Sequence, residues 1–124
     1  MIELHSYFKP LNPGIYSEKE RWETTQIGRL IDSHTADYFP DVKFAEIAIF
    51  NVPEYEGSKN KSTELDCKVR SSFYSLHYDE LPRVVDLGVM QMMPTRKESF
   101  KSIQDVCEAL INEGIIPIII GGGH

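Results

Sequence analysis

The most constraining feature of this sequence is its last stretch, where a run of isoleucines leads into glycines. Five of the six residues from Ile115 to Ile120 are isoleucine. A β-branched run of this length predicts a strand buried on both faces, as in the parallel sheet of an α/β protein. Pro117 inside the run lacks a backbone N–H, which argues against full central pairing at that residue.

Three glycines, Gly121, Gly122 and Gly123, follow where this strand would reach its carboxyl end. Ligands bind at that edge of open α/β sheets. Consecutive glycines remove every side chain there and allow backbone angles that other residues avoid. The sequence therefore predicts that His124 reaches the rim of the sheet on a backbone that a ligand can approach closely.

Earlier segments predict alternating strands and helices. Residues 44–50 and 83–88 predict two strands, and apolar spacing predicts a helix from about Thr63 to Leu76. Thr95 and Glu98 form a capping box, and Gly114 suits a left-handed cap, so a helix is expected between them. Its predicted core stripe consists of Phe100, Ile103, Val106, Cys107, Leu110 and Ile111.

Residues 1–16 are expected to form an irregular arm, because prolines and a glycine cluster there. A capping box at Ser17 predicts a helix that runs as far as Pro40. Its predicted apolar face consists of Ile27, Leu30, Ile31, His34 and Tyr38, and His34 is interpreted as a buried, hydrogen-bonded side chain. Residues 17–124 are expected to form one α/β body with a parallel sheet.

Composition excludes several classes of function. The net charge is −6 and no stripe of Lys and Arg exists, so a nucleic-acid partner is not expected. The first residues lack the pattern of a signal peptide, and no apolar run is long enough for a membrane span. Cys67 and Cys107 lie far apart and are interpreted as reduced thiols of a cytoplasmic protein.

A strand that runs into Gly-Gly-Gly-His resembles a metal-binding motif of the ureohydrolases, the family of arginase, agmatinase and formiminoglutamase. Further segments match in order, with Pro53 after the first strand, Arg70 and Tyr74 in the following helix, and then Asp86-Leu87-Gly88. The resemblance covers residues 44–124 and implies a three-layer α/β/α, arginase-like fold. Gly123, where many members have aspartate, makes formiminoglutamase-like members the nearest branch.

The resemblance also implies a function. It makes His124 a ligand of one of two manganese ions, whose other ligands come from Asp-x-His-x-Asp and Asp-x-Asp motifs that are absent from this sequence. The chain is thereby expected to be the amino-terminal part of a manganese-dependent hydrolase that cleaves a guanidino or formimino C–N bond of a small molecule. On its own it would contain no catalytic residue and be inactive.

The polar segment from Glu54 to Glu64 follows the first predicted strand, and is either a lid over a site or a disordered tip. Glu54 and Asn60 are candidates for contact with substrate, although the glycine-rich run that many family members have there is missing. Arg70 is interpreted as an exposed helical charge, and Asp86 as an acceptor for loop amides.

Two alternatives remain open. The glycine run also suits a nucleotide- or phosphate-binding α/β domain, which would need a lysine and a hydroxyl residue beyond His124. A third possibility is a non-catalytic α/β module that self-associates through Ile115–Ile120, which would make the protein a homo-oligomer.

Overall fold

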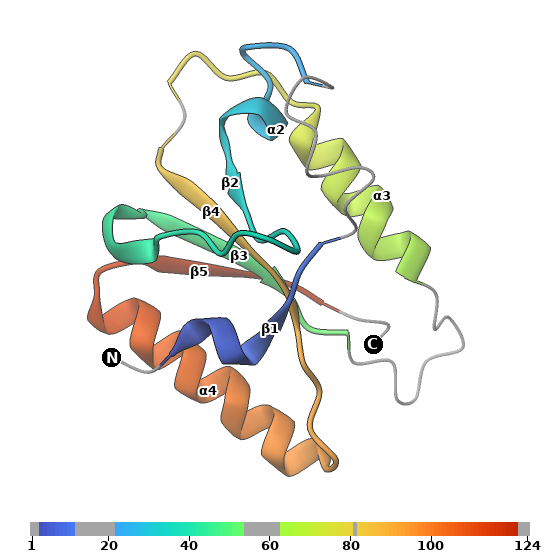
Figure 1. Cartoon of the computed structure of the whole chain (residues 1–124), viewed down its shortest axis with the longest axis vertical. Coiled ribbons are helices and arrows are strands. Elements are labelled where there is room, and N and C mark those ends of the chain that lie inside the picture. The colour runs from blue at the N-terminus through green and yellow to red at the C-terminus, as the bar shows by residue number, and fades with distance from the viewer. Residues whose placement is uncertain (1–2, 12–21, 54–62, 81, 122–124) are drawn as a thin grey trace.

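The computed structural model describes residues 3–11, 22–53, 63–80 and 82–121, with the side chains of the third range from residue 69 onward. Its elements are easiest to follow by colour along the chain (Figure 1). In chain order they are η1 (Leu4–Tyr7), β1 (Phe8–Lys9), α2 (Ile27–Leu30), β2 (Asp32–Ser33), η3 (Val42–Phe44), β3 (Ile47–Asn51), α3 (Thr63–Tyr74), β4 (Val84–Met90), α4 (Arg96–Asn112) and β5 (Ile116–Ile120).

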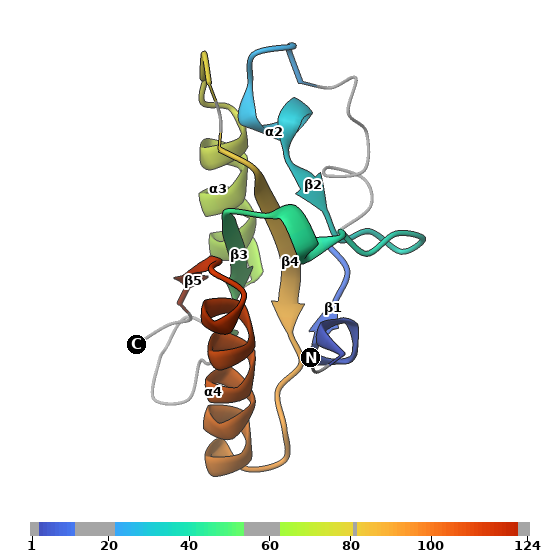
Figure 2. The same cartoon turned by 90° about the vertical axis from the view of Figure 1, so that its left-hand side faces the viewer.

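These strands form one mixed, mostly parallel sheet. The path through the sheet runs β1-β4-β3-β5, and β2 also pairs with β4. β2 and β3 are parallel to β4, and β5 is parallel to β3, whereas β1 is antiparallel to β4. Figure 2 shows β5 at one side of the sheet and the two short strands at the other. The predicted α/β class with a parallel sheet is therefore confirmed at this level.

The two long helices contact opposite faces of the sheet. Ala48 and Phe50 of β3 belong to one core cluster with Val106 and Leu110 of α4. Ile49, the residue between them, belongs to a second cluster, which contains Tyr74 of α3. Successive side chains of a strand point to opposite faces, so α3 and α4 lie on different sides of β3.

Local signals correctly predict both ends of α4. Thr95 is its N-cap, and the Thr95 Oγ1 accepts a hydrogen bond from the Glu98 N–H at 3.1 Å. Gly114 has φ +78°, the left-handed conformation expected just past a helix end. The core stripe of α4 is only partly as predicted, because Ser99, Ser102, Val106 and Leu110 are buried whereas Phe100 and Ile111 are exposed.

The isoleucine run forms a strand as predicted, but the expectation that both its faces are buried is wrong. β5 pairs only with β3, so within the described part of the chain no strand pairs with its outer edge. Large parts of Ile116, Ile118 and Ile119 are consequently exposed. β3 and β4, which have neighbours on both edges, are mostly buried.

The helix predicted from residue 17 to Pro40 is also wrong in its described part. Only Ile27–Leu30 is helical, and the chain then extends into β2. The His34 N–H donates to the Asp86 carbonyl at 2.9 Å, and its own carbonyl accepts from the Leu11 N–H. Main-chain pairing with β4 outweighs the helical spacing here, because a helix would satisfy only its own backbone and leave the groups along this side of β4 unpaired.

The amino-terminal arm contains regular structure where irregular chain was expected. Leu4 and Phe8 are buried, and Phe8 pairs with Met90 of β4. Gly88 of β4 has φ +98°, and a Cβ at this position would collide with the Lys9 carbonyl oxygen. A glycine at position 88 therefore lets β1 approach β4 closely.

Candidate functional site

The carboxyl edge of the parallel strands is where the sequence predicted a site. Asn51, the last residue of β3, lies opposite Ile120, the last residue of β5. The Val52 N–H donates to the Ile120 carbonyl at 2.9 Å, so the two strands stay paired to their ends. Gly121 then leaves the sheet beside Asn51, exposed, with open space where a Cβ would lie.

Most of the predicted site residues cannot be placed against this edge. The proposed metal ligand His124 and the glycines Gly122 and Gly123 lie outside the described residues. The candidate substrate contacts Glu54 and Asn60 do too. Gly121 is the one member of the predicted set that the structure describes, and it lies at the edge of the sheet where the sequence predicted it.

A buried ion pair lies directly behind this edge. Arg70 of α3 is only 2% exposed, and it binds Asp86 of β4 in a bidentate manner. The Arg70 Nε lies 2.8 Å from Asp86 Oδ2, and its Nη2 lies 3.0 Å from Oδ1. The interpretation of Arg70 as an exposed charge is therefore wrong, because a carboxylate inside the sheet layer compensates its burial.

The remaining donors of Arg70 extend this contact to two strand ends. Its Nη1 donates to the Asn51 Oδ1 at 2.7 Å, and its Nη2 also donates to the Gly88 carbonyl at 3.0 Å. One guanidinium thus connects α3 to the last residue of β3 and to the irregular part of β4. The arginine fork suits this task, because its N–H groups point in fixed directions.

The Asp86 carboxylate also accepts hydrogen bonds from groups other than Arg70. The Tyr74 hydroxyl donates to its Oδ2 at 2.7 Å, and the Gly88 N–H donates to its Oδ1 at 3.0 Å. Asp86 was predicted to accept from loop amides, and the amide that it binds here belongs to Gly88 of its own strand. Burial, followed by the nearby Asp86 carboxylate, raises the pKa of Tyr74 well above its ordinary value. The tyrosine is therefore neutral at pH 7, and its hydroxyl lies 2.7 Å from the Ser33 Oγ.

This arrangement anchors the sheet edge and is not suited to acid–base chemistry. Four donors surround the Asp86 carboxylate, which matches the number of lone-pair sites that a carboxylate offers. A carboxylate occupied in this way has no free site to take a proton from a substrate. We name the set Arg70, Asp86, Asn51, Tyr74 and Ser33 the polar anchor, because it joins α3 to β2, β3 and β4.

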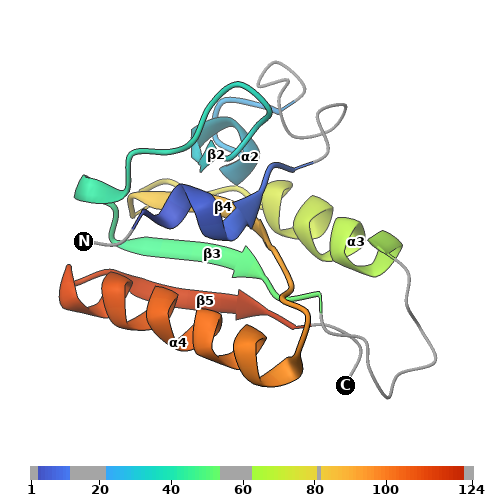
Figure 3. The same ribbon diagram turned by 60° about the horizontal axis from the view of Figure 1, so that its bottom comes forward.

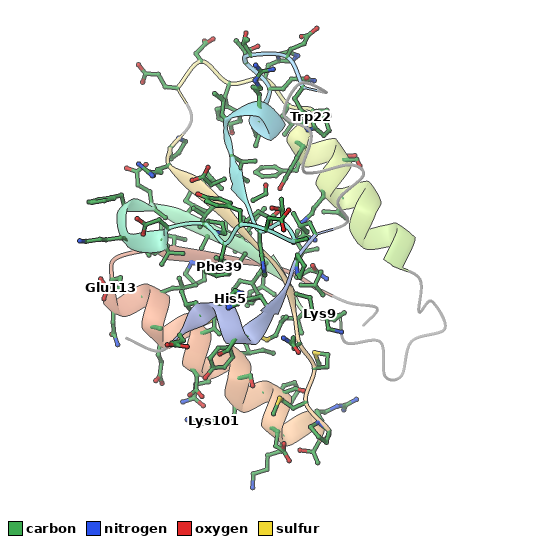
Figure 4. The ribbon with its side chains drawn as sticks, viewed as in Figure 1. His5, Lys9, Trp22, Phe39, Lys101 and Glu113 are labelled. Atoms are coloured by element: carbon green, nitrogen blue, oxygen red, sulfur yellow. The ribbon has the colours of Figure 1, made fainter. Side chains whose placement is uncertain are left out.

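A second cluster of side chains surrounds His34, next to Leu87 of β4. His34 is buried, and its Nδ1 lies 2.9 Å from the Leu87 carbonyl, which confirms the prediction of a buried, hydrogen-bonded histidine. Its ring centroid lies 4.8 Å from that of Phe39 and 5.8 Å from that of His5. Figure 4 labels His5 and Phe39, whose rings meet edge to face. Burial lowers the pKa of His34.

The described side chains do not build a metal centre. Among them, no three His, Cys, Asp or Glu residues gather in a way that could hold an ion. Cys107 is a free thiol, as predicted, and partial burial raises its pKa. The side chain of Cys67 lies outside the described set.

The sequence did contain a signal for the polar anchor. Arg70 and Tyr74 are four residues apart, so they share one face of α3. Asp86 was the one acid in a predicted strand whose other residues, apart from Arg83 at its start, are apolar or glycine, and such a residue needs a buried partner. Asn51 and Ser33 gave no comparable signal, because their roles depend on which strands lie together.

No described helix is long and apolar enough to cross a membrane. Comparison of the chain with protein-family models, with curated proteins and with solved structures found no significant match.

Proposed function

We propose that this chain is the amino-terminal part of a ureohydrolase-like enzyme, a manganese-dependent hydrolase that cleaves a guanidino or formimino C–N bond. In this proposal the sheet belongs to a three-layer, arginase-like fold. The substrate is a small molecule, and His124 is one ligand of the metal. The proposal rests on the sequence resemblance, and one structural observation supports it.

That observation is the course of the chain at the end of β5. β3 and β5 are parallel and remain paired to Asn51 and Ile120. Gly121 consequently begins at the carboxyl edge, the edge at which α/β enzymes bind ligands. The polar anchor holds the last residue of β3 beside it through Arg70. A metal ligand must be held by rigid surroundings. A ligand that follows Gly121 in the chain would be attached to two strands that remain paired to their ends.

The described residues do not supply the rest of a manganese site. No cluster of three suitable side chains exists among them, and Asp86 is already saturated with hydrogen bonds. A single imidazole binds manganese poorly, because this ion prefers carboxylate and water oxygens. We therefore expect the 124-residue chain to assemble no dinuclear centre by itself, and no catalytic step is assigned to it.

The most direct test is to read the gene beyond codon 124. An open frame that soon encodes Asp-x-His-x-Asp, and later Asp-x-Asp, would support the proposal. A frame with lysine and a hydroxyl residue directly after His124 would overturn it in favour of a phosphate-binding loop.

A biochemical test uses the protein encoded by the whole frame and the 124-residue chain side by side. Each is incubated with Mn²⁺ and with arginine, agmatine or formiminoglutamate, and release of urea or formamide is measured. We expect activity from the whole protein, its loss in His124→Ala, and none from the 124-residue chain. Absence of activity on all three substrates in the whole protein would contradict the proposal.

A further inference from the structure

Residues 4–11, which we name the docked arm, are attached to the sheet through short main-chain contacts. β1 is two residues long and pairs with two residues of β4. The Gln91 N–H donates to the Tyr7 carbonyl at 2.8 Å, and at the other end the Leu11 N–H donates to the His34 carbonyl at 2.9 Å. A segment attached in this way can open locally while the rest of the sheet stays folded.

His34 lies where the docked arm and β2 meet, along the edge of β4 that faces away from β3. β1 and β2 pair with β4 on either side of Leu87 and Gly88. The His34 Nδ1 reaches the Leu87 carbonyl in this gap, at 2.9 Å. A carbonyl oxygen only accepts, so the Nδ1 carries a hydrogen and the Nε2 is the atom that takes up a second proton. His34 thus contacts β4 with its ring and the docked arm with its backbone.

Two aromatic rings from different segments pack against the ring of His34. One is Phe39, and the other is His5 of η1, so the docked arm supplies it (Figure 4). The centroids of these two rings lie 5.3 Å apart. His34 is only 3% exposed, whereas His5 is exposed. Departure of the docked arm would therefore remove one of the rings that pack against His34 and separate the two imidazoles.

The surroundings of His34 disfavour a charge on its ring. Burial has the largest effect and lowers the pKa of His34, and a charge on His5 lowers it further. The Leu87 carbonyl and the Asp86 carboxylate of β4 act in the opposite direction, but Arg70 already compensates Asp86 through two hydrogen bonds. The segment that contains Phe39 contributes an uncharged ring. A proton on His34 is therefore better accommodated when water reaches the ring.

We propose that the docked arm is a pH-sensitive element, and that protonation of His34 shifts it toward an open state in which residues 4–11 leave β4. Opening lets water reach the charged imidazole. His5 departs with the docked arm, which also separates two like charges. Leu4 and Phe8 are buried in the docked state, so they hold the docked arm in place while His34 is neutral. Acid therefore raises the population of the open state without releasing every molecule.

The direction of the pH dependence follows from the two environments of His34. In the docked state its pKa lies below the ordinary value of 6.5, and in the open state the ring is in water. The open state therefore binds the proton more readily. The opening equilibrium should be constant above pH 6.5 and should rise as the pH falls below that value. One such histidine raises it by at most about tenfold between about pH 7.5 and about pH 5.5.

The test is amide hydrogen exchange of the 124-residue chain, followed residue by residue by NMR at these two pH values and corrected for the intrinsic exchange rate. The Leu11 and Gln91 N–H groups report on the docked arm, because each takes part in a bond that opening would break. The Thr35 N–H, which donates to the Tyr38 carbonyl at 2.9 Å, reports on the turn next to Phe39. We expect the Leu11 and Gln91 amides to exchange faster than those of β3 at both pH values. Their protection should fall several-fold in acid, while that of Thr35 stays constant.

Substitution of single histidines identifies the group that takes up the proton. His34→Gln keeps a donor for the Leu87 carbonyl but does not titrate, so the Leu11 amide should be equally protected at both pH values. His5→Gln removes the like charge and should give a smaller loss than the wild type. His77→Gln is the matched control, because His77 is exposed and bonds Thr25, away from the docked arm; it should behave as the wild type does. Circular dichroism checks that the variants are folded, and His5→Gln keeps the test open if His34→Gln is not.

Several outcomes would overturn the proposal. If the Leu11 and Gln91 amides exchange no faster than those of β3, the docked arm opens only when the whole fold unfolds. A loss of protection at Thr35 in place of Leu11 would mean that the turn opens instead. Constant protection in the wild type, or a loss that persists in His34→Gln, would remove the role of His34. None of these measurements involves metal or substrate, so their outcome is independent of the proposed hydrolase function.

Discussion

The helices α3 and α4 contact opposite faces of the same sheet and use their side chains in opposite ways. α3 buries the charged Arg70, whereas α4 exposes Phe100 and Ile111. The difference follows from the side of each helix on which these residues lie. Arg70 lies on the side of α3 that faces β3 and β4. Phe100 and Ile111 lie outside the face of α4 that packs on β3 through Val106 and Leu110, and α4 also runs alongside β5 (Figure 3).

This comparison teaches that the side of a helix on which a residue lies decides its burial here more than its hydrophobicity does. A charge can be buried under the middle of the sheet because Asp86 and Asn51 satisfy its donors. Phe100 of α4 remains exposed because no further layer covers it among the described residues. Each half of the comparison can be tested by substitution.

The largest effect is expected at Arg70. Arg70→Met removes three of the contacts that hold α3 and leaves the Asp86 carboxylate buried without its counter-charge. Breaking a buried ion pair in this way costs about 3–5 kcal/mol of unfolding free energy. Urea denaturation followed by circular dichroism measures the loss.

The control for this experiment comes from the other helix. Lys101→Met removes the exposed ion pair with Asp105 on α4, and it should leave the urea midpoint unchanged. Adding Asp86→Asn to Arg70→Met should recover part of the loss, because it removes the uncompensated charge. Equal midpoints for Arg70→Met and Lys101→Met would show that the buried pair does not stabilise the fold.

The two left-handed glycines give a second contrast between these regions. Gly88 adjoins the polar anchor and has no room for a Cβ, whereas Gly114, between α4 and β5, has open space around it. Gly114→Ala should cost about 1–2 kcal/mol, the conformational penalty alone. Gly88→Ala should cost more, because β1 must also move away from β4. Thermal unfolding of both variants checks the order, and a reversed order would contradict the tight β1–β4 contact.

The sequence predicted those parts of the fold whose causes are local. The cap at Thr95 and the left-handed turn at Gly114 depend on residues within one helical turn, and both are confirmed. β1 and β2 were missed because their pairing with β4 joins distant segments. The burial of β5 was overestimated for the same reason, since a run of isoleucines does not reveal whether a strand has one neighbour or two.

The candidate site shows the same division between features with local causes, which the sequence predicted, and contacts between distant segments, which it did not. A strand followed by glycine was enough to predict that Gly121 leaves the sheet at its carboxyl edge. The contact of Arg70 with Asn51 needed the relative position of α3 and β3, which spacing along the chain does not contain. Tyr74 was within reach of prediction, since it shares a helical face with Arg70 and lies close to the one buried acid of β4.

A smaller effect, visible only in acid, is expected from His34. Burial lowers its pKa, the charge of His5 lowers it further, and the Leu87 carbonyl and Asp86 act in the opposite direction. The unfolded chain therefore binds a proton more readily than the folded chain does. Stability should be complete above pH 6.5, the ordinary pKa, and should fall as the pH drops below it towards the lowered pKa of the folded state.

The measurement is the urea midpoint between pH 7.5 and pH 5, for the wild type and for His34→Gln. Glutamine can still donate to the Leu87 carbonyl but does not titrate, so the variant should lose less stability on acidification. Parallel pH profiles for the two proteins would assign the acid sensitivity to other groups.

The smallest effect is expected on α4, at Phe100, an apolar side chain that is nevertheless exposed. Phe100→Gln should change the unfolding free energy by no more than about 0.5 kcal/mol, because the Phe100 side chain is exposed. Val106→Ala, only two turns along the same helix but fully buried, should cost about 2 kcal/mol. If Phe100→Gln proved as costly as Val106→Ala, then Phe100 would be buried in the folded monomer, and the contrast between the covered face of α4 and its open flank would fail.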